Sequence, residues 1–223
     1  MTNKYLSFDH LIWENTKFEY PNMVNISTIR DGSCFFHALI MSFYEPYQKN
    51  KVDRKKFVRE LRKNLANELS NTVKYGGKYD DMSGINDETN KFRDEANQKT
   101  YYETISEGNL PELSKDFPNL KLENMKKELD SSMAIDQIYN EFISNIISRD
   151  IYILNYQEKD VNAVGSYIDK IYKNRESTVI LYRPGHYELV GLIEPGNILR
   201  LSFSPTHPYI MAIKKRMNVL VKT

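Results

Sequence analysis

The pattern of apolar and polar positions predicts two helices in the first third of the chain. Residues 33–44 (SCFFHALIMSFY) are almost continuously apolar, with bulky residues at helical spacing, so we expect a buried helix. Residues 52–73 place apolar side chains every three or four positions between charged ones, which predicts an amphipathic helix with a solvated face. Before them, residues 22–30 mix β-branched and polar residues and end at Asp31-Gly32, which indicates an extended segment followed by a turn.

The second half of the chain alternates between helix and strand patterns. Residues 133–147 repeat apolar side chains at helical spacing, and residues 151–154 form a short β-rich run. Residues 177–181 and 187–193 are two further strands, separated by Arg183-Pro184-Gly185, and we expect them to form an antiparallel hairpin.

A polar stretch interrupts this order at residues 74–119, where glycines and prolines are frequent and aliphatic residues are few. We expect surface helices and mobile loops there, forming either a tolerated insertion or a substrate-binding arm. The resulting pattern of helices and strands predicts a mixed α/β arrangement. We expect one domain over residues 1–195 and a C-terminal extension over residues 196–223, built from a strand and a terminal helix packed on the domain.

Composition and charge exclude several classes of function. The 223 residues include 31 Lys and Arg against 30 Asp and Glu, so the net charge of +1 disfavours a nucleic-acid clamp. The single cysteine rules out an internal disulfide and a Cys-rich zinc site, and we expect no metal or other cofactor. The pattern has no apolar run long enough to cross a membrane, and residues 1–15 lack the apolar core of a signal peptide, so we expect a cytoplasmic monomer. Abundant Lys, Asn, Ile and Tyr are typical of AT-rich genomes, such as those of large DNA viruses, which would make the compartment the host cytoplasm.

Cys34 is the first candidate for chemistry. It stands at the start of the helix predicted for residues 33–44, where unsatisfied backbone N–H groups and the helix dipole favour a thiolate. The amides of Gly32, Ser33 and Cys34 could hold an oxyanion. The alternative is an inert core cysteine, because free cysteines are among the most buried residues.

A cysteine nucleophile needs a base, and His186 is the strongest of the four histidines. It begins a predicted strand, and Glu188, two positions later, shares its face and can accept a hydrogen bond from the imidazole. Asp31 is a second candidate for this orienting role, although it could equally cap the helix. His37 lies one turn after Cys34 and is not expected to reach across the thiol.

These motifs resemble the ovarian tumour (OTU) family of cysteine deubiquitinases. The segment Asp31-Gly32-Ser33-Cys34, followed by aromatic residues, is similar to the family's nucleophile turn, and the block that begins at His186 is similar to its histidine strand. A helix and strand between them, over residues 134–154, also follow the family's order. Two features depart from the pattern: a glutamate stands at position 188, where Asp or Asn is usual, and the middle block lacks a Trp-Gly pair.

The resemblance implies an α+β, papain-type cysteine protease fold, with a small central mixed or antiparallel sheet flanked by helices. It also implies hydrolysis of the isopeptide bond at the C-terminal glycine of ubiquitin. Cys34 would attack the carbonyl, His186 would transfer the proton, and Glu188 or Asp31 would hold the imidazole. The implied partner is ubiquitin, polyubiquitin or a ubiquitin-like modifier. Two alternatives stay open, namely an inactive ubiquitin-binding module and a cysteine protease or deamidase with another substrate.

Overall fold

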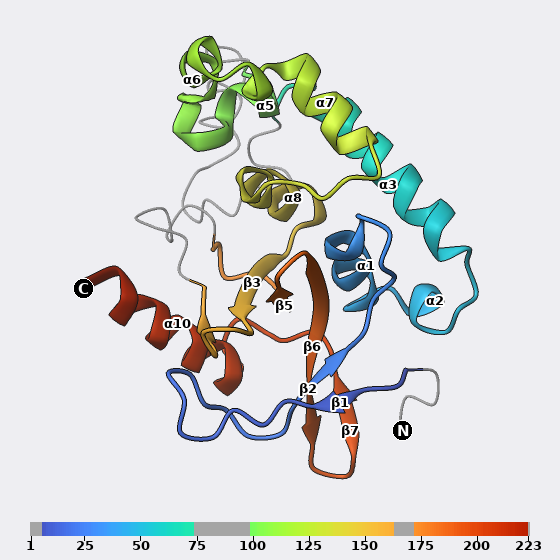
Figure 1. Ribbon diagram of the computed structural model, residues 1–223, viewed down its shortest axis with the longest axis vertical. Coiled ribbons are helices and arrows are strands. Elements are labelled where there is room, and N and C mark those ends of the chain that lie inside the picture. The colour runs from blue at the N-terminus through green and yellow to red at the C-terminus, as the bar shows by residue number, and fades with distance from the viewer. Residues whose placement is uncertain (1–5, 74–98, 163–171, 223) are drawn as a thin grey trace, which may run out of the picture. The chain divides into compact units, whose positions relative to one another are not determined.

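The computed structural model describes residues 6–73, 99–162 and 172–222, which form two compact units (Figure 1). The first unit contains Met1–Val58 and Arg149–Thr223, and the second contains Arg59–Ser148. The division expected at residue 195 does not coincide with either boundary. Residues 74–98 of the expected polar arm lie outside the described residues.

Seven strands form a single mixed sheet in the described part of the first unit, in the order β1-β2-β6-β5-β3-β4, with β7 paired to β6. Only β3 and β5 run parallel, and every other pair is antiparallel. The predicted α+β class with a small mixed sheet is therefore confirmed. The strands are β1 (Asp9–His10), β2 (Met23–Ile26), β3 (Asp150–Asn155), β4 (Asp160–Val161), β5 (Ser177–Arg183), β6 (His186–Glu194) and β7 (Ile198–Arg200).

The predicted hairpin is confirmed and joins β5 to β6 through a two-residue turn. Pro184 has no amide hydrogen to donate, and Gly185 adopts a φ of +72°, which favours glycine. Arg183 therefore pairs directly with His186 across the turn. This turn fixes which side chains of the two strands share a face.

Helices cover both faces of the sheet in the first unit. Four residues of α10 (Pro208–Lys222) are buried in one core with alternate residues of β3, β5 and β6, among them Leu154, Leu181 and Val190. On the opposite face lies α1 (Cys34–Met41), all of whose residues are buried. The Ser42 hydroxyl, just after α1, lies 2.7 Å from that of Thr178, whose side chain alternates with those of the α10 core. The C-terminal segment is thus an integral part of this core.

Among the described residues, the first unit also contains α2 (Glu45–Gln48), and α3 (Arg54–Glu68) contains the boundary between the units. The second unit is helical in its described residues. Its elements are α5 (Tyr101–Thr104), η1 (Ile105–Gly108), α6 (Leu110–Asp116), η2 (Pro118–Leu120), α7 (Leu122–Asp130), η3 (Gln137–Tyr139) and α8 (Asn140–Ile147). None of the described helices is long and apolar enough to cross a membrane.

The helix predicted for residues 133–147 begins later than its apolar pattern suggests. The carboxylate of Asp136 accepts a hydrogen bond from the Ile138 amide at 3.1 Å and caps a short 3₁₀ turn that leads into α8. Met133 precedes this cap and is 72% exposed, so it does not extend the apolar face. The side-chain cap at Asp136 therefore sets where the helical segment begins, and the apolar periodicity does not.

Candidate active site

Cys34 stands at the first position of α1 and is 5% exposed. The turn before it depends on Gly32, whose φ of +78° suits a residue without a side chain. The Tyr187 amide donates a hydrogen bond to Sγ of Cys34 at 3.4 Å, which ties the start of α1 to the start of β6. Segments 153 residues apart therefore meet at the thiol.

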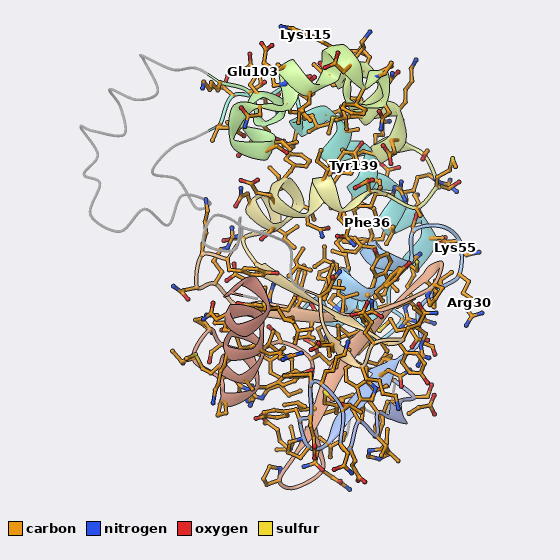
Figure 2. All side chains as sticks on the ribbon, turned by 60° about the vertical axis from the view of Figure 1, so that its left-hand side comes forward. Arg30, Phe36, Lys55, Glu103, Lys115 and Tyr139 are labelled. Atoms are coloured by element: carbon orange, nitrogen blue, oxygen red, sulfur yellow. The ribbon has the colours of Figure 1, made fainter. Side chains whose placement is uncertain are left out.

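A cavity of about 430 Å³ opens beside this thiol. Cys34 and His186, the two residues predicted to carry the chemistry, both line it, and two glycines form part of its wall. Arg30 also lines the cavity, and its exposed side chain extends outward from the molecule (Figure 2). The lining residues are Arg30, Gly32, Cys34, Arg183, Pro184, Gly185 and His186.

Two groups face Nε2 of His186 and define how its ring is used. The Thr28 hydroxyl lies 3.5 Å from Nε2 and donates its only proton to the Tyr187 carbonyl at 2.5 Å, so toward the imidazole its oxygen can only accept. The nearer carboxylate oxygen of Glu188, Oε1, lies 4.0 Å from Nε2 and is also an acceptor. This environment favours the proton on Nε2 and leaves the lone pair on Nδ1, as a base requires.

Glu188 is 4% exposed, and two donors hold its other oxygen, Oε2. The Asn25 side-chain amide and Nε of Arg183 each donate to Oε2 at 2.9 Å. The predicted pairing of Glu188 with His186 is thus present as a close approach, and the hydrogen bonds of the carboxylate go to Asn25 and Arg183.

Asp31 does not contact His186 among the described interactions, and it holds a different histidine. Its carboxylate oxygens lie 3.1 and 3.2 Å from Nε2 of His37, whose Nδ1 contacts the Tyr47 hydroxyl. His37 is completely buried, so both of its nitrogens are used inside the fold. The structure therefore places Asp31 beside His37 and leaves Glu188 as the carboxylate beside His186.

One of the three amides predicted to hold an oxyanion already has a hydrogen-bond partner in the fold. Oδ1 of Asp31 accepts a hydrogen bond from the Ser33 amide at 3.0 Å, so that amide is engaged. The physical reason is that an aspartate readily accepts a hydrogen bond from the backbone two residues later. Gly32 and Cys34 remain as candidate donors.

Burial has the largest effect on the pKa of the Cys34 thiol and on that of the His186 imidazole. Burial raises the pKa of Cys34, an effect opposed by the backbone amides of Tyr187, Phe35 and Cys34 itself. Burial lowers the pKa of His186, with Glu188 opposing this shift and Arg30 and Arg183 adding to it. At neutral pH both shifts favour a neutral thiol beside a neutral imidazole, so His186 is suited to act as a general base.

The buried imidazole of His37 makes stability depend on pH. Burial lowers the pKa of His37, opposed by Asp31, so the folded state resists protonation. Below about pH 6.5 the unfolded chain binds a proton that the folded chain does not, and the free energy of unfolding should fall by up to about 1.4 kcal/mol per pH unit. His186 contributes in the same direction.

Urea unfolding between pH 7.5 and pH 5 measures this dependence while the carboxylates stay ionised. His37→Gln should flatten the curve, whereas the same change at the exposed His10 should not. Stability that is constant or rises as the pH falls would contradict the prediction.

Sequence reasoning missed three polar partners of this site, namely Asn25, Thr28 and Arg183. Asn25 and Thr28 approach β6 only through the tertiary fold, 158 or more residues away in the sequence. The position of Arg183 could have been predicted from the sequence, because a two-residue turn at Pro184-Gly185 places it opposite His186. In the described residues no group of three or more His, Cys, Asp or Glu side chains is arranged to hold a metal ion.

Comparisons with known proteins identify two similar solved structures. One is an ovarian tumour (OTU) domain in complex with ubiquitin, with 14% identity over 90% of this chain and 88% of that chain and a TM-score of 0.48. The other is the crystal structure of the viral OTU domain protease from Farallon virus, with 12% identity over 84% of this chain and 98% of that chain and a TM-score of 0.33. No protein-family model and no curated protein sequence matches the chain.

Proposed function

We propose that this protein is an OTU-like, thiol-dependent hydrolase of the isopeptide bond at the C-terminal glycine of ubiquitin. The observation that carries the proposal is the convergence of Cys34 and His186 on one cavity, with the Tyr187 amide on the thiol. The motifs around these two residues, which resemble the OTU nucleophile turn and histidine strand, support the same reaction.

The proposed reaction begins when His186 Nδ1 takes the thiol proton and Sγ of Cys34 attacks the glycine carbonyl carbon. The amides of Gly32 and Cys34 stabilise the oxyanion of the tetrahedral intermediate. His186 then returns the proton to the departing lysine amine, which leaves a thioester between Cys34 and ubiquitin. Water, deprotonated by His186, hydrolyses the thioester and restores the thiol.

The walls of the cavity support a substrate that ends in two glycines. Gly32 and Gly185 contribute only backbone there, and apart from the residues next to it in the chain no atom lies within 4 Å of the position that a side chain on Gly185 would begin to fill. The open space beside Gly185 leaves room for the extended backbone of a substrate. Ubiquitin, with its diglycine C-terminus, is therefore the substrate we propose, and the cytoplasm is the proposed compartment.

A panel of diubiquitins, one for each linkage, tests the choice of substrate. The protein should release monoubiquitin from at least one linkage, because the Cys34 thiol and the His186 imidazole line the same cavity. A ubiquitin-like modifier with the same diglycine terminus, fused to a reporter, is the matched control. Failure on every diubiquitin, by folded protein whose thiol can be alkylated, would contradict the proposal, and cleavage of the control alone would point to another modifier.

A further inference from the structure

The two carboxylate oxygens of Glu188 have different partners. Oε2 accepts two hydrogen bonds at 2.9 Å, one from the side-chain amide of Asn25 and one from Nε of Arg183. Oε1 is the oxygen that approaches Nε2 of His186, at 4.0 Å. One oxygen therefore holds the side chain in place while the other points toward the imidazole.

The strand register brings these four residues to one face of the sheet. Arg183 is paired with His186, and Glu188 lies two positions after His186, so their side chains point the same way. Asn25 on β2 is paired with Val190, which puts it diagonally opposite Glu188. Three strands, β2, β5 and β6, therefore contribute one polar cluster.

Arg183 is itself held from two sides. Its guanidinium lies 3.5 Å from the centre of the Tyr156 ring and forms an ion pair with Glu188. A buried carboxylate that lost such a partner would be left with an uncompensated charge. The side chain of Glu188 also has enough rotational freedom to turn away from His186 once Oε2 is released.

We propose that Asn25 and Arg183 are positioning residues, which act through Glu188 to keep Oε1 directed at Nε2 of His186 and so leave Nδ1 for the thiol. The proposal deepens the proposed function and rests on it for the reaction concerned. Neither residue needs to touch the substrate to fulfil this role.

A double-mutant cycle separates positioning from direct action. Arg183→Gln should lower kcat for hydrolysis of a fluorogenic ubiquitin C-terminal amide roughly 10- to 100-fold, with KM changed less than about threefold. Arg183→Lys, which keeps a charge and donor hydrogens, should recover most of that loss. In a Glu188→Gln background, Arg183→Gln should cost little more, because the residue through which it acts has already been altered.

Arg200→Gln is the matched control, because Arg200 forms the same kind of pair, with Glu194, at the other end of β6. It should leave kcat and KM unchanged. Asn25→Ala should reproduce the kcat loss of Arg183→Gln, and thermal unfolding must show that each variant is folded. An unchanged kcat in folded Arg183→Gln and Asn25→Ala, or equal losses from Arg183→Gln in both backgrounds, would overturn the proposal.

The rate of Cys34 alkylation by iodoacetamide near neutral pH provides a readout that needs no ubiquitin. Asn25→Ala removes a donor to Oε2 of Glu188 without removing a charge, so any change in this rate acts through the position of Glu188. Asn25→Ala should lower the rate severalfold, and Arg200→Gln should leave it unchanged. An unchanged rate in folded Asn25→Ala would overturn the proposal. A lowered rate in a protein that cleaves no ubiquitin conjugate would support the positioning role and contradict the proposed function instead.

Discussion

Cys34→Ala is expected to reduce hydrolysis of ubiquitin conjugates by about 10⁴-fold or more. The reason is that the acyl-enzyme route depends on one sulfur atom, and the chain has no second cysteine to replace it. Release of a fluorophore from the C-terminus of ubiquitin measures the effect directly.

The fold should survive this substitution. Cys34 is the first residue of α1, and its replacement by alanine removes one buried sulfur atom, at a cost of about 1 kcal/mol in the free energy of unfolding. Cys34→Ser is the matched control, because it keeps the size of the side chain and offers a much weaker nucleophile. If either folded variant retained more than a few per cent of the wild-type activity, Cys34 would not be the nucleophile.

His186→Ala should lower kcat by roughly 10³- to 10⁴-fold, since the neutral thiol favoured by burial then has no base. The rate of Cys34 alkylation should fall in parallel near neutral pH. Both effects are read from steady-state kinetics and from the mass of the alkylated protein.

Two other histidines provide the comparison for this experiment. His207 also pairs with a carboxylate, that of Glu194, and His207→Ala should leave kcat unchanged. His37→Ala should mainly lower stability, because both ring nitrogens of His37 are engaged by Asp31 and Tyr47. A greater loss of kcat from folded His37→Ala than from His186→Ala would reverse the assignment of the base.

The sequence predicted the elements of the site better than its contacts. Helix α1 and the β5–β6 hairpin follow local patterns, namely an apolar run after Asp31-Gly32 and a Pro-Gly turn before His186. Local patterns also placed His186 and Glu188 on one face, because strand side chains alternate. These features needed no knowledge of the tertiary fold.

The partners of the two acidic residues could not be predicted in the same way. Asn25 reaches Glu188 because β2 pairs with β6, a register set by the whole sheet. Asp31 contacts His37 because the imidazole of His37, in the first turn of α1, lies close to the loop that precedes the helix. Sequence reasoning dismissed His37 for the thiol and overlooked it as the partner of Asp31.

The most direct test of the central proposal is a covalent one. Ubiquitin with a thiol-reactive electrophile at its C-terminus should form a one-to-one adduct with the wild-type protein, and peptide mass spectrometry should place the link on Cys34. Cys34→Ala should form no adduct under the same conditions. Absence of the adduct on folded wild-type protein, or an adduct that persists in Cys34→Ala, would contradict the account.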